Sequence, residues 1–367
     1  MNWPVIKESD NTVVTINNKQ LVNYTSNDYL GLSQNHELKN TISEAINTYG
    51  LGSTGSRRLS GNHQVFLDTE ELIAHWIGKE AGVMFNSGYQ MNCSIFSTLA
   101  SKSTLILADK LSHASLIDGI QSSPAQLMRF RHNDIQHLSQ LLKKYAHTYE
   151  SVLIVCESIY SMDGDEAPIH EIIELKTKYN ATLLVDEAHS IGLYGNGGSG
   201  WLNQYQVMPQ IDIVLIPFGK AFGLSGAMFV SNNHFTSLIK AKCRGYIYST
   251  ALPIAIGIGI QKACQLIQSS DDLRQKLKNH IEAFKSILKT DSNSQIQPII
   301  IGSNHHAAEC EKALMDSGFF VRAVHHPTVP KGQSRLRITL SAHLKTDQII
   351  ELGNQINTVL DTINQAV

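Results

Sequence analysis

The chain has 367 residues, enough for a large domain and a smaller one, and its formal net charge of −2 gives no basic surface that would favour nucleic acid or an acidic membrane. Its five cysteines are odd in number, scattered and without the spacing of metal ligands, as expected for reduced thiols in the cytoplasm. The first residues show no signal peptide, and the longest apolar run, 251–260, is too short to span a bilayer. We therefore expect an intracellular protein without a membrane segment or a nucleic-acid partner.

The chain divides into three predicted parts. Residues 1–32 form an N-terminal segment, in which strands over 12–16 and 21–24 flank an Asn-Asn-Lys turn typical of a β-hairpin. Residues 33–268 alternate between short apolar runs and amphipathic helical segments, which predicts a mainly parallel, doubly wound α/β sheet. The pattern of residues 269–367 predicts a smaller α+β domain.

Two glycine-containing loops come early in the large predicted domain. The stretch Gly50–Gly61 is rich in glycine and hydroxyl side chains, but it lacks the final lysine of a P-loop and follows no strand, so we expect an irregular loop near the site and no nucleotide binding. At Gly88 and Tyr89 a strand is followed by a glycine turn that opens a helix. The free N–H groups of such a helix start can bind phosphate, although the glycine can equally serve as a structural cap.

Polar side chains follow two further predicted strands. His113 comes after the strand at 105–108, and Ser161 follows the strand at 152–156 in a glycine-containing stretch. A lone histidine in this place is often only a residue at the start of a helix. Because the carboxyl ends of parallel strands line the ligand-binding crevice of α/β sheets, both segments are candidates for the site.

A strand that ends in Asp186 and a later strand that leads to Lys220 give the strongest signal. His189 follows Asp186 closely, and Lys220 lies in a glycine-flanked turn between two apolar runs. Singly, these residues fit helix capping, core polarity or a lysine that reaches solvent. A lysine that loses its charge on burial becomes a nucleophilic amine. An aspartate strand followed 34 residues later by a lysine strand is more specific than either residue alone, and both groups suit Schiff-base chemistry with a carbonyl cofactor such as pyridoxal 5′-phosphate (PLP).

The predicted small domain contains a long helix followed by a strand, a helix and two more strands, at 297–301, 305–317, 319–323 and 335–340. Arg337, in the last strand, can bind a carboxylate through two N–H groups or can be a solvated strand residue. Two histidine pairs, His305–His306 and His325–His326, are potential metal ligands. Adjacent side chains on a strand point to opposite faces, so we predict no metal site.

The motifs and their order resemble those of the α-oxoamine synthases, a family of fold-type I PLP enzymes. The similarity runs from Ser26 to the end of the chain and includes the stretches S-N-D-Y-L-G-L, L-S-H-A-S, Y-S-M-D-G-D and Y-S-T. The resemblance implies a large domain with a seven-stranded, mainly parallel sheet and a smaller α+β C-terminal domain. It also implies a homodimer, because the family's Y-S-T segment reaches the phosphate of the neighbouring subunit.

The resemblance also assigns roles around the cofactor. Lys220 would hold PLP covalently and remove a proton from the amino acid, while Asp186 would bind the ring nitrogen. His113 would stack on the ring and contact substrate, and His189 and Ser161 would bond the 3-oxygen. Glycine, aromatic and hydroxyl residues would bind the phosphate: Gly88, Tyr89, Ser249 and Thr250.

The substrates follow from the same resemblance. Arg337 would hold the carboxylate of an amino acid, and Thr328, in a P-T-V-P motif, would contact substrate. The stretches A-D-K-L-S-H-A-S-L, R-F-R-H-N-D and H-P-T-V-P-K-G-Q favour the branch that condenses L-alanine with a pimeloyl thioester and releases CO₂. Sister enzymes that use glycine or L-serine share much of this pattern. Some heteromers of the family contain a non-catalytic subunit, which typically lacks the lysine.

Three features depart from the family pattern. Pro217 stands where a threonine usually bonds the phosphate, and proline offers no donor. His325 replaces a common arginine, and the N-terminal helix with a substrate-binding arginine is missing. We expect the first departure to weaken cofactor retention and the other two to affect pimeloyl specificity.

Overall fold

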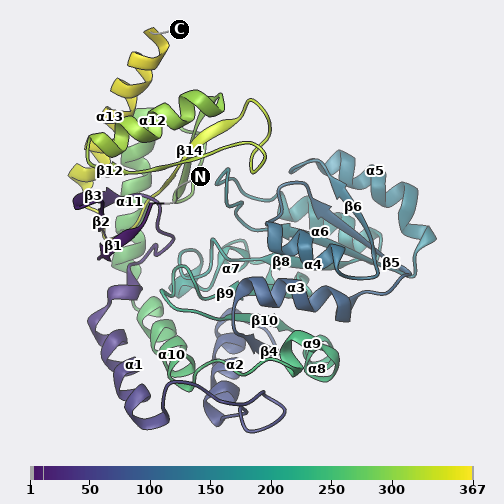
Figure 1. Ribbon diagram of the computed structural model, residues 1–367. Helices are drawn as coiled ribbons and strands as arrows, with labels where there is room; N and C mark the ends of the chain where they lie inside the picture. The colour runs from purple at the N-terminus through teal and green to yellow at the C-terminus, as the bar shows by residue number, and fades with distance from the viewer. Residues whose placement is uncertain (1–3, 11, 366–367) are drawn as a thin grey trace. The chain divides into compact units, whose positions relative to one another are not determined.

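The computed structural model describes residues 4–10 and 12–365, which form two compact units (Figure 1). The larger unit contains residues 35–160 and 166–269. The smaller unit contains the N-terminal segment up to Gln34, residues 161–165 and the chain from Ser270 onward. Residues 1–3, on which part of the N-terminal prediction falls, lie outside the described residues.

A seven-stranded sheet forms the centre of the larger unit, which is fully described. The strands run in the order β4-β10-β9-β8-β7-β5-β6, and only β10 is antiparallel to its neighbours. Their bounds are β4 Ala81–Phe85, β5 Thr104–Asp109, β6 Gln126–Phe130, β7 Ser151–Glu157, β8 Thr182–Asp186, β9 Ile213–Pro217 and β10 Ala227–Ser231. The predicted fold class, a mainly parallel seven-stranded α/β sheet, is confirmed.

Helices connect these strands and cover the sheet. They are α1 His36–Tyr49, α2 Gln64–Ile77, α3 Gly88–Leu99, α4 Ala114–Gln121, α5 Ile135–Tyr145, α6 Ile169–Lys178, α7 Trp201–Gln204, α8 Asn233–Lys242, α9 Arg244–Ile247 and α10 Ile254–Gln268. Short 3₁₀ turns lie at Ala146–Thr148 (η2), Asn196–Gly198 (η3) and Met208–Gln210 (η4). Each parallel strand needs such a crossover, which is why strands and helices alternate along the sequence.

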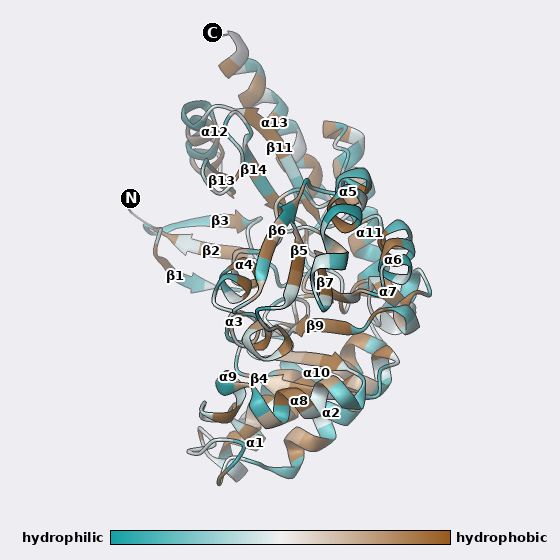
Figure 2. Cartoon of the chain, turned by 90° about the vertical axis from the view of Figure 1, so that its right-hand side faces the viewer, coloured by the Kyte–Doolittle hydropathy of each residue, from teal (hydrophilic) through white to brown (hydrophobic). Residues whose placement is uncertain are grey.

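The core of the larger unit follows the two-residue period of its strands. Alternate residues such as Leu153 and Val155 of β7 and Leu184 of β8 pack with α3, α4 and α8 in one buried cluster. Most of these strands are apolar between their ends, as Figure 2 shows for β9. A sheet that is buried on both faces can therefore place polar groups only where its strands end.

The smaller unit combines two sheets with long helices. Its elements are β1 Ile6–Ser9, β2 Val13–Ile16, β3 Lys19–Asn23, η1 Leu32–Gln34, α11 Asp271–Leu288, β11 Ile296–Gly302, α12 Asn304–Asp316, β12 Phe319–Phe320, β13 Arg322–Val324, β14 Ser334–Thr339 and α13 Thr346–Gln365. The sheets have the orders β1-β2-β3-β12 and β11-β14-β13. Asn17 and Asn18 both have positive φ, as the predicted hairpin turn requires.

The smaller unit also changes three expectations from the sequence. The N-terminal segment belongs to the same unit as the C-terminal region, because β3 pairs in parallel with β12. The expected single strand at 319–323 is wrong, since Val321 separates β12 from β13 and the two join different sheets. The strand argument against a metal site at His305 and His306 is also wrong, because both residues lie in α12.

Among the described residues, no helix combines the length and apolar character needed to cross a membrane. Thiol groups are free at all five cysteines, four of which are buried: Cys156, Cys243, Cys264 and Cys310.

Candidate active site

Two buried carboxylates lie side by side where β7 and β8 end. Glu157 and Asp186 are direct partners in the parallel ladder and are 2% and 4% exposed. They continue the alternation of Leu153, Val155 and Leu184, so their side chains point to the face covered by α3 and α4. Burial raises the pKa of Glu157 to about 8 and also raises the pKa of Asp186. Ionising the two carboxyl groups at this edge of the sheet therefore costs free energy, which a bound cation would offset.

Lys220 is a cation whose charge acts on both carboxyl groups. It lies in the loop between β9 and β10, which is closed by a hydrogen bond from Phe218 N to Gly226 O at 3.0 Å. Its Nζ lies 2.6 Å from Nε2 of His189, a buried residue of the loop after β8. Burial raises the pKa of Glu157 and of Asp186, and the charge of Lys220 offsets part of this rise. The structure thus brings together Lys220, His189 and Asp186, and their roles toward a cofactor stay a prediction.

His113 joins this group from the loop after β5. Its backbone N–H donates to Glu157 Oε1 at 2.5 Å, and its Nδ1 accepts a hydrogen bond from Ser115 N at 3.3 Å. The residue therefore caps α4, which was the simpler interpretation of its position. Burial of the ring, followed by the charge of Lys220, lowers its pKa, so the imidazole is kept neutral. His113 therefore caps α4 and also lies within range of the charge of Lys220.

The predicted phosphate residues Gly88 and Tyr89 open helix α3. Ser87 caps this helix by accepting a hydrogen bond from Gln90 N, and the helix start offers the free N–H groups that an anion requires. A Cβ atom on Gly88 would lie 3.1 to 3.2 Å from the ring of Pro217, so the end of β9 borders this helix start closely. Tyr89 is 55% exposed and donates from its hydroxyl to Asp118 Oδ2 at 2.6 Å.

Ser249 and Thr250 lie beside the same helix start in the same chain. Gln90 Nε2 donates to Ser249 Oγ at 2.5 Å, and Asn86 Nδ2 donates to Thr250 O at 2.8 Å. Ser56, in the glycine-rich loop of residues 50–61, forms a β-bridge with Thr250. The loop is therefore anchored near the candidate phosphate site, and the role of these hydroxyls toward a second subunit stays a prediction.

The remaining predicted residues belong to the smaller unit. Arg337 Nε donates to the backbone oxygen of Ser161 at 2.6 Å, and its Nη2 donates to Asn27 Oδ1 at 3.2 Å. Thr328 is exposed in the loop between β13 and β14. The structure thus brings Ser161 together with Arg337 in the smaller unit, which also contains Thr328, whereas Lys220 belongs to the larger unit.

The residues of the larger unit fit a cofactor with an aldehyde, a basic ring nitrogen and a phosphate. Lys220 supplies the amine, and the buried carboxylate of Asp186 would be stabilised by a protonated ring nitrogen. The start of α3 supplies backbone N–H groups for a phosphate. Pro217 borders this place without a donor, which agrees with the departure seen in the sequence. The donor set therefore fits PLP.

Two residues of these clusters were missed in the sequence. Glu157 ends its strand as Asp186 ends the next one, so counting strand ends would have placed both carboxylates at one edge. Asn27 lies in the S-N-D-Y-L-G-L stretch, but no local pattern connects it to Arg337, 310 residues away. The sequence therefore contained a pattern that could have identified Glu157, but none that could have identified Asn27.

Comparisons with known proteins show the family and the fold of the chain. The family model of class I and II aminotransferases matches residues 19–356. An 8-amino-7-oxononanoate synthase of Vibrio atlanticus is 35% identical over 99% of this chain and 90% of its own length. A variant of the serine palmitoyltransferase of S. paucimobilis, solved with PLP and myriocin bound, has a TM-score of 0.95 at 28% identity, covering 99% of this chain and 93% of its own. An 8-amino-7-oxononanoate synthase from Francisella tularensis has a TM-score of 0.81 at 29% identity, covering 95% and 99%.

Proposed function

The chain belongs to the aminotransferase class I and II family and, within it, to the α-oxoamine synthases, and we propose that it catalyses the PLP-dependent reaction of 8-amino-7-oxononanoate synthases. In this reaction L-alanine condenses with a pimeloyl thioester of coenzyme A or of acyl carrier protein, with release of CO₂ and the free thiol, in biotin biosynthesis. The observation that carries the proposal is the amine of Lys220, 2.6 Å from His189 Nε2 and electrostatically coupled to buried Asp186.

Most of the residues assigned to PLP lie in the larger unit. In the larger unit, Lys220 would bind its aldehyde carbon, Asp186 its ring nitrogen and His113 its ring face. Its phosphate would be bound at the start of α3 and by neighbouring hydroxyls: Gly88, Tyr89, Ser249 and Thr250. The assignment of Ser161 to the 3-oxygen, together with His189, rests on the resemblance of the Y-S-M-D-G-D stretch alone.

The chain's own residues account for the proton transfers. PLP, when bound, supplies the electron sink that makes the α-hydrogen of the amino acid acidic. Lys220 would remove that proton, which requires its amine to be neutral. His189 Nε2, 2.6 Å from Nζ, is placed to accept the proton of the Lys220 ammonium. Burial raises the pKa of Asp186, and a protonated ring nitrogen would offset this effect and favour its ionised form, while neutral His113 would contribute no competing positive charge.

The substrate groups are assigned to the smaller unit. Arg337 would bind the carboxylate of L-alanine, since its guanidinium is fixed by Ser161 O and Asn27 Oδ1. Thr328 would contact the pimeloyl thioester from its exposed loop. Both assignments rest on the family motifs.

A serine palmitoyltransferase activity is the second candidate. The observation in its favour is the TM-score of 0.95 with the S. paucimobilis enzyme, against 0.81 with the F. tularensis synthase. The sequence identities to the two solved proteins, 28% and 29%, do not separate them, whereas the Vibrio synthase reaches 35% over nearly the whole chain. The amino-acid substrate, L-serine or L-alanine, distinguishes the two activities.

Visible spectroscopy and a condensation assay test the proposal together. The purified protein should show the absorption of lysine-bound PLP, which borohydride bleaches, and L-alanine should perturb this absorption more than glycine or L-serine does. With pimeloyl-CoA and L-alanine, CO₂ and free thiol should be released in equal amounts. A spectrum that responds best to L-serine, with turnover only on palmitoyl thioester, would establish the second candidate. A protein that stays colourless with added PLP would refute both.

The assembly and location of the protein are further parts of this proposal. We expect a homodimer in the cytoplasm. The family's Y-S-T motif at residues 248–250 and the five free thiols support these two expectations respectively. Light scattering of the PLP-loaded protein should give twice the mass of the chain.

A further inference from the structure

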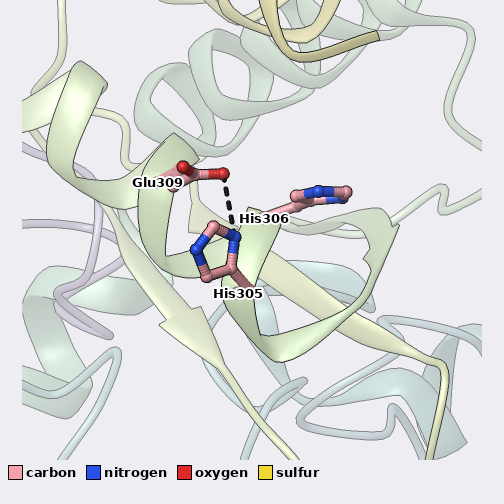
Figure 3. A group of neighbouring side chains, drawn as sticks. All are labelled: His305, His306 and Glu309. Carbon is pink, nitrogen blue, oxygen red and sulfur yellow. Dashed lines mark ion pairs between the residues drawn. The ribbon is translucent and has the colours of Figure 1, made fainter. Parts of the chain in front are cut away.

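Three potential metal ligands share one face at the start of helix α12. At about 100° per residue, His305, Glu309 and His306 lie at roughly 0°, 40° and 100° around the helix, so Glu309 falls between the two histidines. Each offers one ligand atom, and these atoms all lie within 4.8 Å of one another. His305 Nδ1 is 3.1 Å from Glu309 Oε2, and Figure 3 shows this ring and carboxylate facing each other, with His306 beside them on the same helix. Within residues 4–10 and 12–365 no other group of three such side chains converges in this way.

The backbone beneath this cluster is fixed. Ser303 caps α12 by accepting a hydrogen bond from His306 N at 3.1 Å, which sets the first turn of the helix. The side chains themselves remain accessible, because those of His305 and Glu309 are 77% and 50% exposed. A metal ion needs ligand atoms closer together than 4.8 Å, and side chains this exposed can rotate to close that distance without moving the helix.

The cluster also opens onto a groove between α12 and α13. This groove has a volume of about 490 Å³, and α13 contributes polar side chains opposite the histidines: Gln355, Thr358 and Thr362. An ion held by three ligands from α12 would keep positions open toward this groove, where water or a groove side chain can complete its coordination. None of these residues belongs to the proposed active site.

We propose that His305, His306 and Glu309 form a binding site for a divalent transition metal ion of the zinc type. Two imidazoles and one carboxylate are ligands that zinc binds in proteins, and three protein ligands leave a coordination position open. The single carboxylate discriminates against magnesium and calcium, which require several oxygen ligands. Copper(II) should bind more tightly than zinc at the same ligands, following the general affinity order of these ions. The positive end of the helix dipole opposes a cation here, so the carboxylate of Glu309 is essential to the site.

Zinc binding to the PLP-loaded protein tests the site directly. Competition with a chromophoric chelator should reveal one zinc equivalent that His305→Ala and Glu309→Gln each weaken at least about tenfold, because each removes one ligand. His147→Ala is the matched control, since it removes an exposed histidine from η2 and should leave this equivalent intact. Circular dichroism should show that all variants are folded.

Copper(II) provides a second readout that identifies the ligands. The electron paramagnetic resonance spectrum of the protein with one equivalent of copper should show coupling to two nitrogens, reduced to one in His305→Ala or His306→Ala. Equal zinc binding by wild type, His305→Ala and Glu309→Gln would mean adventitious metal elsewhere, at PLP or scattered histidines, and would overturn the proposal. Displacement of zinc by equimolar magnesium would overturn it as well.

Discussion

The two units bury charge in opposite ways. In the larger unit, Glu157 and Asp186 lie side by side at neighbouring strand ends, and burial raises the pKa of both carboxyl groups. In the smaller unit, Arg335 is 1% exposed, but its Nη1 lies 2.5 Å from Asp163 Oδ1 and also donates to the carbonyl of Met162 at 3.2 Å. The first arrangement brings like charges together, whereas the second neutralises its charge in place.

This difference separates a ligand site from a structural contact. A buried ion pair with good hydrogen bonds is satisfied within the protein and holds two segments together, here the stretch 161–165 and β14. Two buried carboxylates with raised pKa leave electrostatic free energy that a cationic ligand can recover. We infer that the Glu157 and Asp186 edge is adapted to a positively charged cofactor ring, and that the Arg335 and Asp163 pair serves the fold.

The largest expected effect is the loss of activity in Lys220→Ala. We expect turnover to fall by about 10⁴-fold or more, because both the covalent attachment and the proton transfer depend on this amine. Lys79→Ala is the control: burial lowers the pKa of Lys79 to about 8, but its amine donates to the carbonyls of Met208, at 2.8 Å, and Ile211. That variant should lose stability and keep its turnover within about threefold. If Lys220→Ala kept a tenth of the normal rate in the condensation assay, the amine of Lys220 would not be the group on which turnover depends.

The next largest effect is a loss of stability when the ion pair of Arg335 and Asp163 is broken. Asp163→Ala leaves the guanidinium of Arg335 buried without its carboxylate, so the free energy of unfolding should fall by about 3 kcal/mol. Urea unfolding followed by circular dichroism measures this change. The double variant Asp163→Ala/Arg335→Met removes the charge altogether and should recover most of the loss. If Asp163→Ala were as stable as the wild type, the pair would contribute nothing to the fold.

A smaller, pH-dependent effect is expected for Glu157→Gln in the protein without PLP. The pKa of Glu157 rises from 4.5 to about 8 on folding, so between these pH values the native state holds a proton that the unfolded state has lost. This residue therefore makes the wild type less stable as the pH rises from 4.5 to 8. Glutamine has no such proton, and it can still accept the hydrogen bond from His113 N.

Urea unfolding at pH 5 and at pH 8.5 measures this linkage. Glu157→Gln should be more stable than the wild type by roughly 2 kcal/mol at the higher pH and nearly equal at the lower one. Glu174→Gln, at an exposed position of α6, is the control and should follow the wild type. If the free energy of unfolding changed equally with pH in the wild type and in Glu157→Gln, burial would not raise the pKa of Glu157.

Much of the larger unit could be predicted because its determinants are local. Apolar runs of strand length mark the parallel strands, and the polar residues that follow them must meet at one edge, which placed Asp186 and Lys220. The bond between Lys220 and His189 needed the observed loop conformations, which no spacing rule supplies. Glu157 was overlooked although it obeys the same rule as Asp186.

The smaller unit was harder because its contacts join distant parts of the sequence. The pairing of Val22 with Phe319 and the contact of Asn27 with Arg337 span about three hundred residues, and no periodic pattern encodes them. The ion pair of Arg335 could not be predicted, because its partner Asp163 lies in a stretch that the sequence assigned to another domain. His305 and His306 were judged by strand geometry, whereas helical spacing brings them together with Glu309.

The smallest expected effect is a change in PLP affinity when Pro217 is replaced. This residue ends β9, pairs with Ala227 and borders the start of α3 at Gly88, where a hydroxyl would be close to a bound phosphate. Pro217→Thr should lower the dissociation constant of PLP about fivefold, which corresponds to one hydrogen bond of about 1 kcal/mol. Spectroscopic titration of the PLP-free protein measures this constant, and Pro217→Val, with a similar shape and no hydroxyl, is the control. An equal gain in both variants would assign the effect to the backbone N–H that proline lacks, and no gain in either would place the phosphate away from this strand end.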